Sequence, residues 1–179
     1  MLRHATVLAM FCAVVTPANA AEVLAQRFEV GFNYAGYDER YDDPLVPLLP
    51  ANACYTWHVQ LAPAATGAPA PTTIVERLVL PVPLADWGTL ATTPDDNVEI
   101  SPDGTTAITT FAAAPDAEGW LANGWCVAAG DPVGAHRFEL ELDGASLASF
   151  DFDVVAPEDY NWPSIPQPDP MSRSVYNSW

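Results

Sequence analysis

Acidic side chains are the residues of this sequence whose type and spacing come closest to a chemical site. Two acid-rich stretches carry several oxygen ligands each, as a calcium ion requires from one flexible loop. They comprise Asp38, Glu39, Asp42 and Asp43 in the first stretch and Asp95, Asp96, Asn97 and Glu99 in the second. Neither stretch has the spacing or the glycine placement of a known calcium loop. We therefore interpret both as solvated charge and predict no metal or other cofactor.

Catalytic motifs are sparse. His58 and His136 each occupy an alternating position in a predicted strand, where a half-buried histidine is ordinary. No serine lies in a G-x-S-x-G setting, and no glycine-rich phosphate loop is present. We therefore predict no catalytic residue. A carboxylate-based enzyme stays open as an alternative, because the spacing of a catalytic acid pair is spatial rather than sequential.

The charge of the chain excludes several classes of partner. Its 179 residues include six basic side chains, all of them arginine, against 23 acidic ones, so the net charge is −17 and the pI is about 4.1. Such a chain repels the phosphates of nucleic acids and anionic membrane surfaces. Half of the residues are hydrophobic and 11% are aromatic, which is too many for a disordered chain. We expect one folded domain.

The first twenty residues predict export. Arg3 and His4 precede an apolar run from Ala5 to Val15, and small residues follow up to Ala20. This pattern is typical of a secretory signal peptide, and the run is too short to span a bilayer. We predict cleavage after Ala20, no stable membrane insertion afterwards, and a periplasmic or secreted location. Lipidation at Cys12 is disfavoured, because the preceding residue is a phenylalanine.

Two cysteines, Cys54 and Cys126, would remain after cleavage. In an exported protein, two thiols indicate one disulfide. The bridge would link positions 72 residues apart, a loop that chain-entropy arguments value at about 4 kcal/mol. No CxxC motif or His/Cys cluster supports a structural zinc site.

Short alternating segments predict an all-β fold. In each of them, apolar and polar residues alternate with a period of two, or β-branched residues predominate. The predicted strands are 27–34, 54–61, 73–80, 98–101, 105–111, 125–129, 136–142 and 150–154. Residues 116–123 are predicted to form one helical turn. The pattern favours an antiparallel β-sandwich of about seven strands over residues 21–155.

The same alternation predicts where the disulfide lies. Cys54 is on the strand face opposite Tyr55 and Trp57, and Cys126 is opposite Trp125. If the aromatic residues form the core, the bridge lies outside it and joins strand ends. The alternative places both cysteines inward and leaves the tryptophans exposed as a binding surface. We favour the first arrangement.

The last segment, residues 156–179, is rich in proline and aromatic residues. Five prolines in 24 residues favour extended backbone, and four large aromatic side chains are unusual in a free linker. We expect this tail to pack back on its own domain. A peptide ligand for a partner is the alternative.

The closing hairpin resembles a known family. Residues 130–138 lead through Asp143 and Gly144 to Phe150, Phe152 and Val154. This run is similar to the end of the immunoglobulin-like or fibronectin III-like β-sandwich domains of bacterial envelope proteins, with a glycine-led strand, a D-G turn and a final F-x-F-x-V strand. The resemblance covers about 25 residues. It implies the fold and carries over no site residue.

Three functions follow as hypotheses. The first is a non-catalytic sandwich that binds another envelope or secreted macromolecule, a protein or a glycan, through loops or an edge strand. The second is an acidic inhibitor of a basic exported enzyme such as a cell-wall hydrolase, steered by charge. The third is a carboxylate-based enzyme or a calcium-dependent module. We favour the first.

Overall fold

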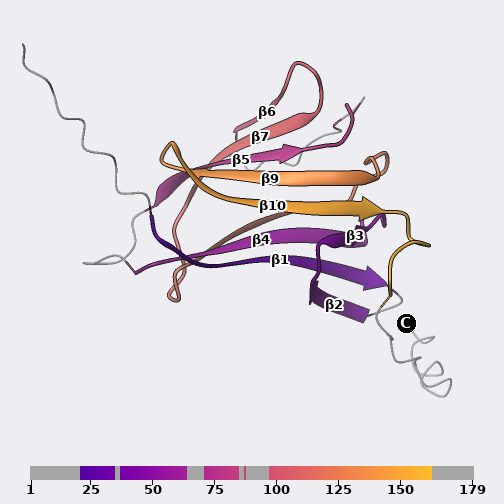
Figure 1. The fold of residues 1–179 in the computed structure, drawn as a ribbon, viewed down its shortest axis with the longest axis horizontal. Coiled ribbons are helices and arrows are strands. Elements are labelled where there is room, and N and C mark those ends of the chain that lie inside the picture. The colour runs from indigo at the N-terminus through magenta and orange to yellow at the C-terminus, as the bar shows by residue number, and fades with distance from the viewer. Residues whose placement is uncertain (1–20, 35–36, 64–70, 85–86, 88–96, 163–179) are drawn as a thin grey trace, which may run out of the picture.

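The computed structural model describes residues 21–34, 37–63, 71–84, 87 and 97–162. Within them lie ten strands in two stacked sheets, so the expected all-β sandwich is confirmed and the expected number of strands is too small. Figure 1 shows the two layers, with β1, β2 and β4 in one and β5, β9 and β10 in the other. No helix in the described ranges is long and apolar enough to cross a membrane.

Sheet A has four strands, and all of its neighbouring pairs are antiparallel. In spatial order its strands are β2 (Tyr37–Asp42), β1 (Val23–Tyr34), β4 (Ala53–Leu61) and β8 (Trp120–Cys126). The predicted helical turn at 116–123 is wrong. Residues 117–119 form a turn, and strand β8 starts at Trp120, because the Asp116 carboxylate accepts hydrogen bonds from the amides of Glu118 and Trp120 and closes the turn early.

Sheet B has six strands. In spatial order they are β3 (Leu45–Pro47), β10 (Ala145–Val155), β9 (Gly134–Leu142), β5 (Thr72–Val79), β7 (Thr106–Ala113) and β6 (Asn97–Ile100). All neighbours are antiparallel except β3, which pairs with β10 in parallel. The D-G turn expected at Asp143 and Gly144 is confirmed, with φ of 48° and 81°, and Gly104 between β6 and β7 has a φ of 72°. Such left-handed backbone suits glycine and aspartate.

The sequence pattern missed β2 and β3. Four of the six residues of β2 are charged, so the segment reads as a solvated loop. Strand β3 has three residues and ends in Pro47, which sequence rules assign to a turn. Both form because a neighbour offers a free edge, β1 to β2 and β10 to β3.

The core lies between the sheets, where the alternating faces predicted from the sequence meet. Phe28 of β1 stacks on Phe152 of β10 with the ring centroids 4.8 Å apart, and Tyr55 of β4 contacts Phe138 of β9 at 5.8 Å. Trp57 is completely buried. These contacts align β1 with β10 and β4 with β9.

Candidate functional site

The solvent-facing side of sheet A, which we call the outer face of sheet A, is the candidate site. Inward positions of its strands fill the core, so the alternate positions must face solvent. The outer face comprises Arg27, Glu29 and Gly31 of β1, Arg40 and Asp42 of β2, Cys54, Thr56, His58 and Gln60 of β4, and Trp120, Ala122, Gly124 and Cys126 of β8.

An ion network crosses this face from β1 to β2. Arg27 Nη2 and Arg40 Nη1 each lie 3.3 Å from a carboxylate oxygen of Glu29, and Arg27 Nε lies 3.5 Å from Asp42 Oδ1. The Glu29 side chain is only 14% exposed, since the two arginines cover it. Among the described side chains of this face, two arginines balance two acids, whereas the whole chain carries a net charge of −17.

A shallow pocket of about 180 Å³ opens beside this network. It is lined by Glu29, Gly31, Phe32, Arg40, Ala51, Asn52, Cys54 and Thr56. Gly31 has no side chain to fill the space between Arg40 and the disulfide. The volume is below the roughly 300–1,000 Å³ of sites that enclose a small molecule. It suits one projecting group of a larger ligand, with an amide, a hydroxyl and two charged groups in reach.

The disulfide lies at the edge of this pocket. Cys54 and Cys126 are directly opposed on β4 and β8, and their sulfur atoms are bonded. The expected pairing is therefore present in the structure. The bridge lies on the outer face near the strand ends, whereas Tyr55 and Trp57 are buried and Trp125 is half-buried. The arrangement with the aromatic residues inward is confirmed.

The two histidines do not meet. His58 lies on the outer face of sheet A, edge-to-face with Trp120, and its Nε2 is buried without a hydrogen-bond partner in the described part of the chain. Burial, together with the nearby Arg27 guanidinium, lowers its pKa. His136 is buried between the sheets, where its Nδ1 donates to the Gly134 carbonyl at 2.8 Å; burial lowers its pKa as well.

The acidic stretches are dispersed rather than convergent. On β2, Arg40 and Asp42 face outward, so Glu39 points the other way. Its carboxylate accepts a hydrogen bond from the Tyr41 hydroxyl. The Asp43 carboxylate accepts a hydrogen bond from the Leu45 amide. Asp95 and Asp96 lie outside the described residues, as do the side chains of Asp38 and Asn97, and Glu99 is exposed on β6. Across the described ranges, no three His, Cys, Asp or Glu side chains are grouped as metal ligands.

A buried carboxylate that the sequence reading passed over lies beneath this face. Glu76 of β5 is completely buried between the sheets. It accepts hydrogen bonds from the indoles of Trp57 and Trp125, the latter at 2.6 Å, and from the Asn123 amide at 3.1 Å. The signal was its place in an alternating strand, since Ile74 and Leu78 on either side also face inward. Glu76 ties β5 to β4 and β8 and so fixes the strands under the candidate site.

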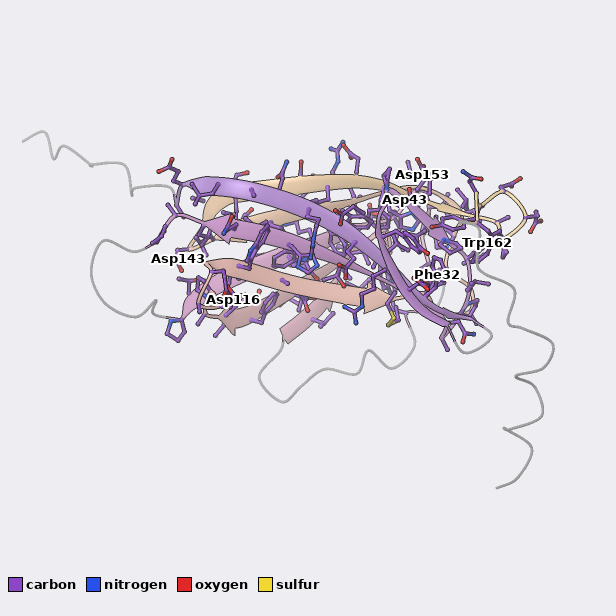
Figure 2. The ribbon with its side chains drawn as sticks, turned by 90° about the horizontal axis from the view of Figure 1, so that it is seen from below. Phe32, Asp43, Asp116, Asp143, Asp153 and Trp162 are labelled. Carbon is purple, nitrogen blue, oxygen red and sulfur yellow. A yellow bond between two sulfur atoms is a disulfide. The ribbon has the colours of Figure 1, made fainter. Side chains whose placement is uncertain are left out.

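The start of the C-terminal tail packs on the sandwich. Tyr160 is 4% exposed, and its ring and that of Trp162 lie 5.9 and 5.3 Å from Phe32. Figure 2 shows Phe32 and Trp162 together at the end of the molecule opposite Asp116 and Asp143. Burial and the neighbouring Asp43 raise the pKa of Tyr160 to about 12. Residues 163–179 and 1–20 lie outside the described ranges, so the domain boundary at 156 and the signal peptide stay predictions.

Comparison with known proteins identifies a family. The family model of the PM0630 beta sandwich domain matches residues 28–155. An immunoglobulin-like protein from Pseudomonas aeruginosa is 18% identical, with a TM-score of 0.41 over 77% of this chain and 100% of that one. The alkylpurine DNA glycosylase AlkC of Pseudomonas fluorescens, bound to DNA with an abasic-site analogue, is 12% identical, with a TM-score of 0.34 over 62% and 27%. No curated protein matches.

Proposed function

Because this chain belongs to the PM0630 beta sandwich domain family, whose model spans residues 28–155, we propose that it is an exported, immunoglobulin-like, non-catalytic domain that binds another envelope or secreted macromolecule. The predicted signal peptide supports export. The outer face of sheet A is the binding surface in this proposal. The observation that carries it is the pocket on that face, beside described charged side chains that balance one another, on a chain of net charge −17.

Rigidity supports a binding role. The face rests on four paired strands, on the Cys54–Cys126 bridge and on the Glu76 network below it. A preorganised surface loses little conformational entropy when it binds. The pocket then receives one polar group of the ligand, held by Arg40, Asn52 and Thr56.

The test fills the pocket. A Cβ built at Gly31 would meet Arg40 Cγ at 3.6 Å, an ordinary contact, so the backbone accepts a side chain here, and Gly31→Leu is chosen to fill the pocket that Gly31 lines. Ala135→Leu is the matched control, since Ala135 is a small residue on the outer side of sheet B, away from the pocket. We expect the oxidised, exported protein to capture a partner from envelope or secreted fractions at low and at high salt, and Gly31→Leu alone to lose it. Equal capture by both variants would remove the pocket from the proposal, and no capture by the unaltered protein would refute binding altogether.

The second candidate function, inhibition of a basic exported enzyme, has its own supporting surface. The outer side of sheet B carries five acids against Arg77 and Arg137, which are themselves paired with two of these acids. The acids are Glu99, Glu139, Glu141, Asp151 and Asp153. Binding there would depend on long-range charge, so it would be lost at high salt. Asp153→Asn combined with Glu139→Gln would weaken it, and Gly31→Leu would leave it unchanged.

A further inference from the structure

In the part of the chain that the structure describes, four strands form the edges of the two sheets, and three of them are protected against pairing with another chain. Folded proteins protect sheet edges with charge, proline or short length. Strand β2 is charged at four of six positions, β3 has three residues and a proline, and β6 has four residues. Strand β8 is seven residues long, carries no charge and no proline, and pairs with β4 without a bulge.

The free side of β8 presents an ordered row of backbone groups. The amides of Leu61 and Val127 donate to the carbonyls of Gly119 and Ala53, so the odd-numbered residues from 119 to 127 are those that exchange hydrogen bonds with β4. The N–H and C=O groups of the even-numbered residues therefore point away from β4. The backbone groups of Trp120 are already bonded within the turn, since its N–H donates to the Asp116 carboxylate and its C=O accepts from the Asp116 amide. Ala122, Gly124 and Cys126 remain, all three exposed and small, and no described residue other than those of β4 pairs with β8.

This edge is held in place before any partner arrives. The disulfide fixes its end at Cys126, while Asn123 and Trp125 donate to buried Glu76 in the opposite sheet. These same bonds place β8 next to β5, and sheet B continues past β5 with β7 and β6. Sheet B therefore extends beyond the edge of sheet A at β8. A strand added to β8 would lie over β7, and its inward side chains would face that strand.

The charges around β8 select the occupant. Asp116 and Glu118 precede the strand and Asp131 follows it, so both of its ends are acidic. A second copy paired by two-fold symmetry would run antiparallel and bring the acidic start of one β8 against the acidic end of the other. A strand with basic ends meets complementary charge instead.

We propose that β8 is the docking edge for an extended peptide segment of another exported protein, uncharged in its middle and basic at its ends, which adds to sheet A as a fifth strand. This inference rests on the proposed binding function and names its partner class. The partner's backbone bonds to the outward groups of Ala122, Gly124 and Cys126, and its larger side chains lie over the small residues of β8.

The test uses a nine-residue synthetic peptide of alternating threonine and valine with arginine at both ends. We expect it to slow hydrogen exchange at the amides of residues 122, 124 and 126 of the oxidised full chain. Ala122→Pro removes one outward N–H that the fold does not use, and we expect affinity to fall at least about tenfold. Ile100→Pro is the matched control: the Ser101 amide donates to the Thr106 carbonyl, so the Ile100 N–H points away from β7 in the same way.

Two peptides keep the test independent of the stability of the variant. One is N-methylated on the residues that face β8, and the other has glutamate at both ends; both should bind at least about tenfold more weakly than the first. No protection of the three amides by the arginine-ended peptide, equal binding of the glutamate-ended one, or pairing of two copies through β8 would overturn the inference. If Ala122→Pro captures the partner from exported fractions as well as the unaltered protein does, the edge is refuted while the binding function stands. Absence of any partner for the unaltered protein refutes the binding function instead.

Discussion

The buried carboxylate of Glu76 makes the sharpest prediction about stability. Removing it in Glu76→Ala leaves three N–H groups without their acceptor, those of Trp57, Trp125 and Asn123. A buried donor that is left without its acceptor costs about 1–3 kcal/mol, so three such donors set an upper range of about 3–9 kcal/mol. Because Trp125 and Asn123 are only half-buried and reach water on slight relaxation, we place the loss of unfolding free energy at about 3–5 kcal/mol.

Urea denaturation followed by tryptophan fluorescence measures this loss, and a thermal scan should show the midpoint falling by about 10 °C. Glu76→Gln keeps the shape but turns an amide N–H₂ toward an indole N–H, so it should lose about 1–3 kcal/mol. Trp125→Phe removes one of the donors to Glu76. Combined with Glu76→Gln, it should therefore recover part of the free energy that Glu76→Gln loses. Glu141→Ala is the control, because this carboxylate is about one-third exposed and pairs with Arg77; it should lose less than about 1 kcal/mol.

The reasoning about Glu76 is refuted by one clear result. If Glu76→Ala or Glu76→Leu unfolds within about 1 kcal/mol of the unaltered protein while Glu141→Ala behaves the same way, the three donors do not depend on the carboxylate.

Three further predictions concern the disulfide, pH and a close strand contact. Replacing Cys54 and Cys126 by serine should lower the unfolding free energy by about 4 kcal/mol in urea denaturation, and reduction with dithiothreitol should reproduce that loss in the unaltered chain only. His136 has a lowered pKa in the fold, so the unfolded chain binds its proton more readily; stability is complete above about pH 6.5 and declines as the pH falls toward 5, and a flatter urea-midpoint profile in His136→Gln would bear this out. Gly124→Val places a Cβ 2.5 Å from the Tyr55 carbonyl oxygen, so a thermal midpoint several degrees lower is expected, and an unchanged midpoint would contradict the tight approach of β8 to β4.

Part of the candidate site could be read from the sequence, because its pattern is local. Period-two alternation places Tyr55 and Trp57 on one strand face and Cys54 on the other, whatever the strands pair with, and only the packed structure decides that the aromatic face is the core. The turn at Asp143 and Gly144 likewise follows from backbone preferences of those two residues. The two thiols that remain after the predicted signal-peptide cleavage indicated their bridge, which the structure contains.

The remaining features exist only once distant segments meet. The acceptor role of Glu76 depends on Trp57 and Trp125, which lie 19 and 49 residues away in sequence. The pocket needs Gly31, Arg40 and Asn52 from separate segments, each of which is unremarkable alone.

The sequence by itself determined that this chain is an acidic β-sandwich whose cysteines lie on the strand faces opposite Tyr55, Trp57 and Trp125, since charge, strand period and turn chemistry are properties of neighbouring residues. The tertiary structure alone decided which strands lie at the edges, that β8 is the one described edge without charge, proline or short length to protect it, and that a carboxylate is buried beneath it. Pairing order and burial arise from contacts between residues far apart in the chain, and no local pattern encodes them.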